Sequence, residues 1–515
     1  MTFSRRGFLG LTGGVALGAV LGGCGLASEQ PTGQLLRSKA RLPRPFTVPL
    51  PVPRTATLVG RESGTDRYAI TQRRAEIEIL PGTRTPILGY DGQFPGPTIV
   101  SRSGRTTVVE HTNALDIPVV VHLHGGHTPP ASDGFPTDYL LPKGMHQAPS
   151  GHGAHAGRNV AHGSFAYEYP MKQRAATLWY HDHRMDFTGP TVYHGLAGFQ
   201  LIHDAEEDAL PLPGGDRDVP LMIVDRAFEE DGAFRYPALD PTMLHEPGVK
   251  EHYMAGVLGD VVLVNGAPWP ELEVDAARYR FRILNASNAR RYDLRLDPAP
   301  AGGKAFTQIG SDGGLLARPV GQDSIVTAPA ERFDVVVDFS AYDVGTVVTM
   351  RNALGKGSTK DVMRFRVVRK APDDSSVPDT LSTIEELDPA TAVRTRTFTF
   401  ARGDNHGHEE WLINGKPYDP ERVDSKPILG EVELWRFVTD AHHPIHVHLD
   451  SFQVTRRGGG GPGPFDSGWK DTVDVRPGEV VEVAVRFADY AGTYVMHCHN
   501  LEHEDMMMMS NFETL

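Results

Sequence analysis

The side chains best suited to chemistry in this chain are histidines that recur in close pairs, together with one cysteine. They form four clusters, which are His122-Leu123-His124, His181-Asp182-His183, His443-Pro444-Ile445-His446-Val447-His448, and His497-Cys498-His499 with the nearby His503. These clusters hold ten of the 23 histidines, too many for coincidental pairing in one chain. Imidazole and thiolate both bind transition metals. The sequence therefore predicts metal centres built from these clusters.

Cys498 has no nearby thiol, since the only other cysteine is Cys24. A local disulfide is thus excluded, and the thiol must be a nucleophile, a metal ligand or an inert core residue. Structural zinc would use four closely spaced ligands, usually with several cysteines. Two histidines, one cysteine and a weakly bound methionine instead describe a blue-copper electron-transfer site. A Cys–His hydrolase dyad would leave the remaining histidine pairs without a role.

Extended strands would direct the alternate histidines of each pair to one face. The chain has 55 Gly and 40 Pro and few long helix-periodic stretches, which favours an all-β fold of many short strands. In a strand, residues i and i+2 project from one face. In GTYVMHCH (492–499), His497 and His499 would share one face while Cys498 points to the other. One short segment would then touch two metal centres and give electrons a route between them.

At 515 residues the chain is expected to form several domains. Alternating apolar and polar runs fall into three blocks of ordinary domain size, at 65–205, 219–370 and 395–515. A Pro-rich arm at 24–64 precedes them, and an acidic connector at 371–394 separates the last two. Only the first and third blocks carry HxH pairs, so the metal centres are expected to involve these two.

On these motifs the chain resembles the multicopper oxidases, in the branch of spore-coat laccase, bilirubin oxidase and phenoxazinone synthase. The resemblance covers most of 65–515 and includes NGAPWPELEVDAARYRFRILNASNARRY (265–292) and LAGFQLIHD (196–204). It implies three cupredoxin-like Greek-key β-sandwich domains in series and four copper ions. A type 1 ion would lie in the third domain. A trinuclear cluster of one type 2 ion and a type 3 pair would lie between the first and third.

The resemblance also implies a ligand set, position by position. The type 1 ion would be bound by His443, Cys498, His503 and, ten residues after the cysteine, Met508. The neighbouring methionines of the run 506–509 would then pack as apolar side chains. The type 2 ion would be bound by His122 and His446. The type 3 pair would be bound by His124, His181, His183, His448, His497 and His499.

Two carboxylates match positions at which this branch places proton carriers. They are Asp133, in the SDG after the first HxH pair, and Glu504, directly after the last type 1 histidine. Reduction of O2 to water in a buried cluster needs protons, and carboxylates near the metals are suited to carry them. The plainer alternatives are a turn-forming Asp133 and a solvated Glu504. With Cys498 as the electron relay, these are the expected catalytic residues.

The implied activity is that of an oxidase. A small-molecule reductant, such as a phenol, an aminophenol or a bilirubin-like compound, would dock near the edge of His503 and give up single electrons, and O2 would be reduced to two waters. One rival is a cuprous oxidase of copper tolerance, whose usual Met-rich insertion the sequence lacks. Another is a non-catalytic cupredoxin-fold envelope protein, which predicts eroded ligands, whereas none is missing. Copper nitrite reductase is disfavoured, because it lacks the full type 3 set.

Charge limits the partners, while other questions stay open. The net charge of −14 and the pI near 5.9 disfavour nucleic acid or an anionic membrane surface. The Gly-rich segment 143–163 contains several histidines and is either a polar loop or a labile copper-binding segment. The sequence decides neither the physiological substrate nor the oligomeric state.

The N-terminus resembles an export signal. The segment 4–9 (SRRGFL) resembles a twin-arginine signal and is followed by an apolar stretch through Leu21. Leu21-Gly22-Gly23-Cys24 resembles a bacterial lipobox. We therefore expect a signal peptide at 1–23, a lipid on Cys24 and a location in the cell envelope, at the outer face of the cytoplasmic membrane, or outside the cell. The alternative is a plain cleaved signal.

Overall fold

The computed structural model describes residues 32–147, 158–405 and 408–515. The predicted signal peptide and Cys24 lie outside the described residues, as do His152 and His155 of the His-rich segment. The described residues cluster as one compact unit, so the boundaries of the three domains stay predictions. Among the described helices, none is both long and apolar enough to cross a membrane.

The first block forms two sheets that share one hydrophobic core, which includes Ile70, Val109, Leu123 and Leu178. One sheet consists of β2 (Leu58–Glu62), β3 (Thr65–Ile77), β4 (Thr85–Tyr90), β6 (Thr106–Asn113) and β10 (Ser164–Tyr169). The other has the order β5-β12-β11-β7 and consists of β5 (Gly96–Arg102), β7 (Val121–His124), β11 (Ala176–Asp182) and β12 (Ala197–His203). Two predicted HxH segments thus lie on neighbouring strands of one sheet.

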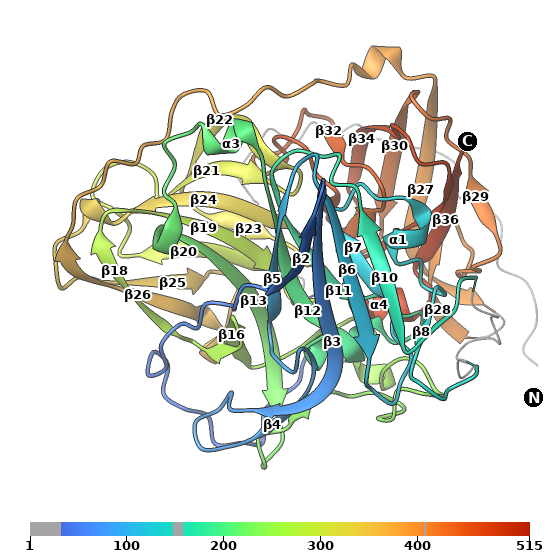
Figure 1. Ribbon diagram of the computed structural model, residues 1–515, viewed down its shortest axis with the longest axis horizontal. Coiled ribbons are helices and arrows are strands. Elements are labelled where there is room, and N and C mark those ends of the chain that lie inside the picture. Colours follow the sequence, from blue (N-terminus) through green and yellow to red (C-terminus); the bar gives the residue numbers. More distant parts are fainter. Residues whose placement is uncertain (1–31, 148–157, 406–407) are drawn as a thin grey trace, which may run out of the picture. The chain divides into compact units, whose positions relative to one another are not determined.

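The second block, green through yellow to light orange in Figure 1, also has two main sheets packed around one core. The larger consists of β13 (Asp218–Phe228), β14 (Phe234–Arg235), β16 (Val261–Val264), β17 (Ala267–Pro268), β19 (Arg278–Asn285), β21 (Phe306–Ser311), β22 (Gly314–Gln322) and β24 (Arg332–Asp338). The smaller consists of β18 (Glu271–Ala276), β20 (Tyr292–Asp297), β23 (Ile325–Thr327), β25 (Val347–Asn352) and β26 (Asp361–Lys370).

The third block repeats this plan, and its strands are orange to red in Figure 1. The first sheet consists of β27 (Arg394–Asn405), β28 (His408–Ile413), β30 (Val432–Thr439), β32 (Phe452–Arg457) and β34 (Val480–Arg486). The second has the order β29-β36-β35-β31-β33 and consists of β29 (Val423–Ser425), β31 (His443–Val447), β33 (Thr472–Val475), β35 (Gly492–Cys498) and β36 (Met509–Thr514). Alternation decides which side chains enter the core: in β30, Trp435 and Phe437 are buried while Arg436 is exposed.

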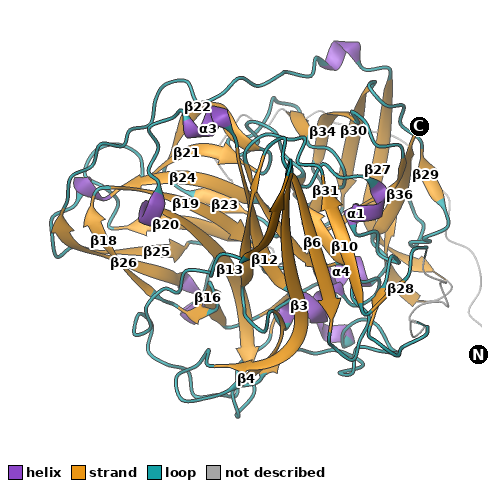
Figure 2. Cartoon of the chain, in the orientation of Figure 1, coloured by secondary structure: helices purple, strands orange, loops and turns teal. Residues whose placement is uncertain are grey.

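The fold class is all-β, as the sequence predicts. Two small strand pairs complete the sheets, β1 (Gln34–Leu35) with β15 (Val257–Leu258) and β8 (Leu140–Leu141) with β9 (Ala161–His162). The helices are few and short among the described residues, as Figure 2 shows. The α-helices are α1 (Pro130–Asp133), α2 (Thr188–Tyr193), α3 (Ala205–Asp208) and α4 (Leu501–Asp505).

A buried charge cluster joins the first block to the second. Glu207 of α3 accepts hydrogen bonds from Arg280 (2.6 Å) and Arg282 (3.1 Å) of β19, and Nδ1 of His203 lies 2.8 Å from its carboxylate. Burial raises the pKa of Glu207, but the cations around it outweigh that effect and hold the pKa well below its usual range. The ionised carboxylate therefore stabilises the folded state.

We expect Glu207→Gln to lower the free energy of unfolding by about 3 kcal/mol at neutral pH, because it leaves two buried guanidinium groups short of an anionic partner. Since the folded pKa is depressed, this stabilisation is complete above the unfolded pKa of about 4.3 and is lost as the pH falls through the folded pKa. Denaturant unfolding of variant and parent at neutral and acid pH measures this. The control is Asp208→Asn, because Asp208 pairs with Arg102 at a half-exposed site and should change stability by under about 1 kcal/mol. A pH-independent difference for Glu207→Gln would contradict the assignment.

Candidate metal centres

Two antiparallel strand pairs bring the HxH motifs of the first and third blocks together. In the first block, His122 of β7 lies opposite His181 of β11. In the third, His446 of β31 lies opposite His497 of β35. Each of these strands carries or directly precedes a second ligand candidate, which are His124, His183, His448 and His499. The strand register therefore presents eight imidazoles in two facing sets.

These eight imidazoles, all buried, form one group that we call the histidine cluster. The two blocks meet in it: His122 stacks on His448 with ring centroids 3.9 Å apart, and His124 stacks on His446 at 3.6 Å. Nε2 of His497 lies 3.2 Å from Nε2 of His183. Groups of three histidines in the cluster place their candidate ligand atoms within 4.8 Å of one another. That spacing suits shared metal ions.

In several of these histidines a backbone carbonyl oxygen binds Nδ1 of the ring, so Nε2 is directed into the cluster. Nδ1–H of His122 donates to the carbonyl oxygen of Asp133 (2.5 Å), and Nδ1–H of His446 donates to that of Asp471 (2.9 Å). Nδ1–H of His181 donates to the carbonyl of Asp182 (2.9 Å). Nε2 of each of these three rings is buried without a hydrogen-bond partner. Such unpaired nitrogens are costly to bury unless a metal ion satisfies them.

The protonation state of the rings also suits a metal. Burial lowers the pKa of His181 to about 3 and that of His183 to about 4. Both are therefore neutral at pH 7, which is the form of imidazole that binds metal. Clusters of neutral imidazoles suit copper, so the residues of the histidine cluster fit a copper site.

A second centre surrounds Cys498. Its Sγ lies 3.3 Å from Nδ1 of His443 and 3.5 Å from Nδ1 of His503, and the two Nδ1 atoms lie 3.2 Å apart. Burial raises the pKa of the thiol well above its ordinary value, so without a metal it is protonated and unreactive. Met508 is fully buried in the same core, and its carbonyl accepts the Cys498 N–H at 3.1 Å. Two imidazoles, a thiol and an adjacent methionine fit a blue-copper site.

Little of His503 reaches the surface, since the residue is 2% exposed. Trp411 stacks on one face of the ring at 3.7 Å between centroids, and Nε2 lies 3.2 Å from the carbonyl oxygen of Ala255. Trp411 and Ala255 therefore cover the ring of His503. The Trp411 Nε1–H donates to the carbonyl of Met254 (3.1 Å), next to Ala255, and so joins the two sides of this cover. A reductant approaching His503 therefore meets the cover before the ring.

The short helix α4 connects both centres to the rest of the molecule. Glu502 accepts hydrogen bonds from Tyr236 (2.9 Å) and Asn288 (2.8 Å) of the second block. Asp505 accepts the backbone N–H groups of Thr188 and Gly189, at the start of α2 in the first block, both at 2.8 Å. Between these anchors lie His503, facing Cys498, and Glu504, facing the histidine cluster. Successive residues of α4 thus contact all three blocks and both metal centres, and so fix their relative positions.

The two predicted carboxylates both reach the histidine cluster. Oε2 of Glu504 lies 3.1 Å from Nδ1 of His497, and Oδ2 of Asp133 lies 2.8 Å from Nδ1 of His448. Burial raises the pKa of Asp133 well above its usual range. Burial also raises that of Glu504, but His497 and His183 outweigh it and hold the pKa below its usual range. Each residue is 1% exposed, so Glu504 is not a solvated surface residue.

Several residues beside the centres do not stand out in the sequence. Asp471 lies 3.0 Å from Nε2 of His124, Asp440 lies 3.2 Å from Nε2 of His443, and Trp179 stacks on His181 at 4.1 Å. None of them belongs to an HxH motif or a comparable spacing. Trp179 could have been suspected from its place two residues before His181 in the same strand.

The comparisons with known proteins agree with this geometry. Family models described as multicopper oxidase match residues 71–207 and 381–515. A laccase from Bacillus stratosphericus is 37% identical over an alignment that covers 90% of this chain and 98% of the relative. The chain belongs to the multicopper oxidase family.

Further relatives of this multicopper oxidase agree. A bilirubin oxidase from Albifimbria verrucaria is 34% identical, with 91% of this chain and 81% of the relative covered. The crystal structure of a multi-copper oxidase from Pediococcus acidilactici superimposes with a TM-score of 0.79 at 31% identity, covering 94% of this chain and 93% of that one. The expected cupredoxin-like all-β fold is confirmed. The protein is a laccase-like, copper-dependent oxidoreductase that uses O2 as the acceptor and four copper ions as cofactors.

Proposed function

We propose that this multicopper oxidase acts on small aromatic reductants, namely phenols, aminophenols or bilirubin-like compounds. Its similarity to proteins named laccase and bilirubin oxidase supports this substrate class. The observation that carries the oxidase mechanism is the position of Cys498, whose Sγ faces His443 and His503. The adjacent His497 and His499 belong to the histidine cluster. One residue thereby links the electron-accepting centre to the oxygen-reducing centre.

We assign the copper ligands accordingly. His443, Cys498, His503 and Met508 would hold the type 1 ion. His122 and His446 would hold the type 2 ion, and the type 3 pair would be held by His124, His181, His183, His448, His497 and His499. Copper in these sites would accept single electrons at the first centre and reduce O2 to water at the second.

The protein's own residues enclose the first centre and fix the helix that carries His503. Trp411 and Ala255 cover His503, and α4 is fixed at both ends by Glu502 and Asp505. A ligand frame that does not move with oxidation state needs little reorganisation, which favours fast electron transfer. The reductant would dock over this cover, where Arg402 lies 5.3 Å from the Trp411 ring.

Protons for the second centre would pass through Glu504 and Asp133. Their positions support this, because each carboxylate is buried beside a histidine of the cluster. Glu504 also lies 3.5 Å from Nδ1 of His183, so its carboxylate spans two rings. Asp133 in turn orients two rings, His448 with its carboxylate and His122 with its carbonyl oxygen.

O2 uptake by the copper-loaded protein tests the substrate class. We expect faster uptake with 2-aminophenol and a methoxyphenol than with cuprous ion at equal concentration, since the relatives of this chain include proteins named laccase and bilirubin oxidase. Uptake driven mainly by cuprous ion would contradict the proposal and indicate a role in copper tolerance.

We further propose that the protein is exported by the twin-arginine route and is anchored by a lipid on Cys24, at the outer face of the cytoplasmic membrane. The sequence of the first 24 residues supports this. Cell fractionation with mass spectrometry of the mature N-terminus tests it. An unmodified N-terminus in the soluble fraction would rule out the anchor.

A further inference from the structure

The guanidinium group of Arg332, at the start of β24, lies where the three blocks meet. Arg332 is fully buried, and all five donors of its guanidinium are used. Nε–H donates to the carbonyl of Thr177 in the first block at 3.0 Å. Within the second block, Nη1 and Nη2 donate to the carbonyls of Ala330 (3.0 Å) and Asp312 (3.2 Å). The two remaining donors form a bidentate pair with Asp471 of the third block.

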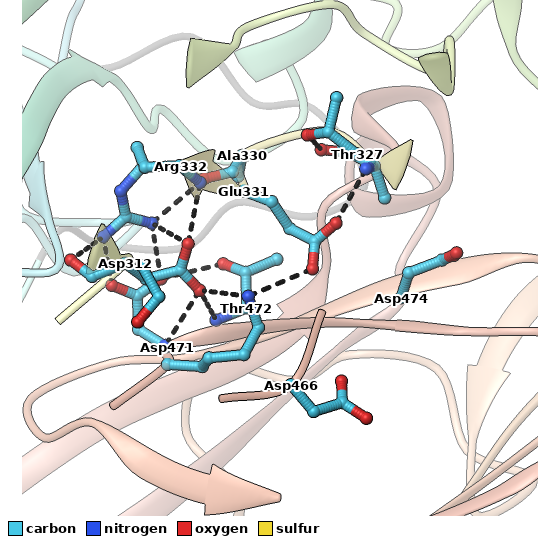
Figure 3. Close-up of polar contacts among 12 residues, drawn as sticks. Asp312, Thr327, Ala330, Glu331, Arg332, Asp466, Asp471, Thr472 and Asp474 are labelled. Atoms are coloured by element: carbon cyan, nitrogen blue, oxygen red, sulfur yellow. Dashed lines mark hydrogen bonds and ion pairs between the residues drawn. The ribbon is translucent and has the colours of Figure 1, made fainter. Parts of the chain in front are cut away.

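Asp471 connects Arg332 to the histidine cluster. Its Oδ1 accepts Nη1–H of Arg332 at 2.7 Å and Nε2–H of His124 at 3.0 Å. The Thr472 hydroxyl donates to the same oxygen at 2.9 Å. Figure 3 shows Arg332 and Asp471 facing each other, with Asp312 and Thr472 beside them. The carboxylate has little freedom to rotate, because both of its oxygens are bound.

His124 is oriented differently from its neighbours. In His122, His181 and His446, Nδ1 is held by an oxygen and Nε2 is left without a partner. In His124, Nε2 is held by Asp471 and the unpartnered nitrogen is Nδ1. The side chain of Asp471 therefore decides which nitrogen of His124 is available to a metal.

We propose that Arg332 is a positioning residue for the trinuclear copper site, although its block supplies no copper ligand. It fixes Asp471, and Asp471 holds His124 with Nδ1 toward the metals. The inference rests on the proposed role of the histidine cluster as that copper site. It gives the second block a part in oxygen reduction.

The surrounding structure is fitted to this pair. Gly125 follows His124 with φ of +83°, and a Cβ there would lie 2.6 Å from Nη2 of Arg332 and 2.7 Å from Oδ2 of Asp471. Only glycine leaves room for the guanidinium and the carboxylate to meet. Asp312 fixes the backbone at both partners of the ion pair. Its carboxylate accepts the N–H of Arg332 (2.7 Å) and those of Asp471 and Thr472 (both 3.3 Å).

The chain contains a matched control for Arg332. Arg282 lies on the adjacent strand β19 of the same sheet, is equally buried, and also reaches Thr177, at 3.3 Å from the hydroxyl. Its anionic partners are Asp218 and Glu207, away from the histidine cluster. Loss of either guanidinium should cost similar stability, but only Arg332 is connected to a proposed copper ligand.

The experiment compares Arg332→Lys with Arg282→Lys. We expect Arg332→Lys to bind trinuclear copper about 10- to 100-fold more weakly in a chelator titration, the usual effect of removing a group that orients a metal ligand. The share of bound copper that gives an EPR signal should rise as the type 3 pair loses its coupling, while the blue type 1 absorption per chain stays unchanged. Arg282→Lys should keep the parent's copper content and EPR spectrum. Both apoproteins should lose thermal stability to a similar extent.

Asp471→Asn preserves side-chain size and tests the same link if Arg332→Lys does not fold. An asparagine oxygen in the place of Oδ1 can still accept from Arg332 and His124. The amide nitrogen in the place of Oδ2 cannot accept the second guanidinium hydrogen bond, so the bidentate pair with Arg332 is lost. Wild-type copper affinity and EPR spectrum in either folded variant, or an equal change in Arg282→Lys, would overturn the inference. A parent protein without trinuclear copper would instead refute the proposed function itself.

Discussion

Cys498→Ser is expected to abolish the intense blue colour and the oxidase activity while the fold and the copper of the histidine cluster are retained. The thiolate is the only soft anionic donor between His443 and His503, and a hydroxyl does not replace it as a ligand for blue copper. Serine is nearly the same size, and its hydroxyl can hydrogen-bond to the nearby Nδ1 of His443, so the loss in stability should be small. The measurements are visible absorption, copper content per chain and O2 uptake with 2-aminophenol.

The unchanged ligands of the histidine cluster provide the internal control. Retention of type 2 and type 3 copper in Cys498→Ser would show that only the first centre and its link are lost. Oxidase activity at the parent level in this variant would refute the assignment of Cys498 as the route for electrons. Loss of all copper together with an unfolded far-UV spectrum would call for the same test in Cys498→Ala.

The local part of these sites could be predicted from the sequence, because strand periodicity acts over two residues. The HxH spacing in β35 is enough to place His497 and His499 on one face and Cys498 on the other, and the structure has this arrangement. The all-β fold class follows from composition and alternation in the same way. The exact ligand role of each histidine rests on the family resemblance and remains a prediction.

The remaining parts of the sites depend on contacts between distant segments. Asp471 meets His124 across 347 positions, and Arg332 meets Asp471 across 139. Neither residue has a distinctive spacing to its neighbours, so only the folded chain identifies it. The cover of His503 is similar, since Trp411 and Ala255 come from different blocks. From the sequence we expect a reductant to dock near the edge of His503, and the structure adds that Trp411 of the third block and Ala255 of the second cover this ring.

Packing against α4 also explains why the middle block is needed although it has no HxH pair. Glu502 anchors α4 to Tyr236 and Asn288, and Arg332 anchors Asp471. Both centres therefore have a support in the second block, one through a helix and one through an ion pair. A protein with only the first and third blocks would keep every proposed ligand but lose these supports.

Glu504→Gln is expected to slow O2 reduction by about 10²- to 10⁴-fold, the usual range for loss of a group that transfers protons, while reduction of type 1 copper by substrate stays near the parent rate. The carboxylate lies beside His497 and His183 and does not contact His443 or Cys498 in the first centre. Glutamine keeps the shape and hydrogen-bonding reach but cannot take up a proton. Stopped-flow absorption separates the two steps: bleaching of the blue band without O2 reports the first, and reoxidation on adding O2 reports the second.

Glu502→Gln is the matched control for this variant. Glu502 lies on the same helix, is equally buried, and bonds to Tyr236, Asn288 and Val257, with no contact to the histidine cluster. Its loss should lower stability and leave the ratio of the two rates near that of the parent. Equal slowing of both steps in Glu504→Gln, or the same change of ratio in Glu502→Gln, would mean that Glu504 acts by holding α4 in place and does not carry protons. A selective loss in Glu504→Gln alone would assign the two carboxylates of one helix turn to separate tasks, anchoring for Glu502 and proton delivery for Glu504.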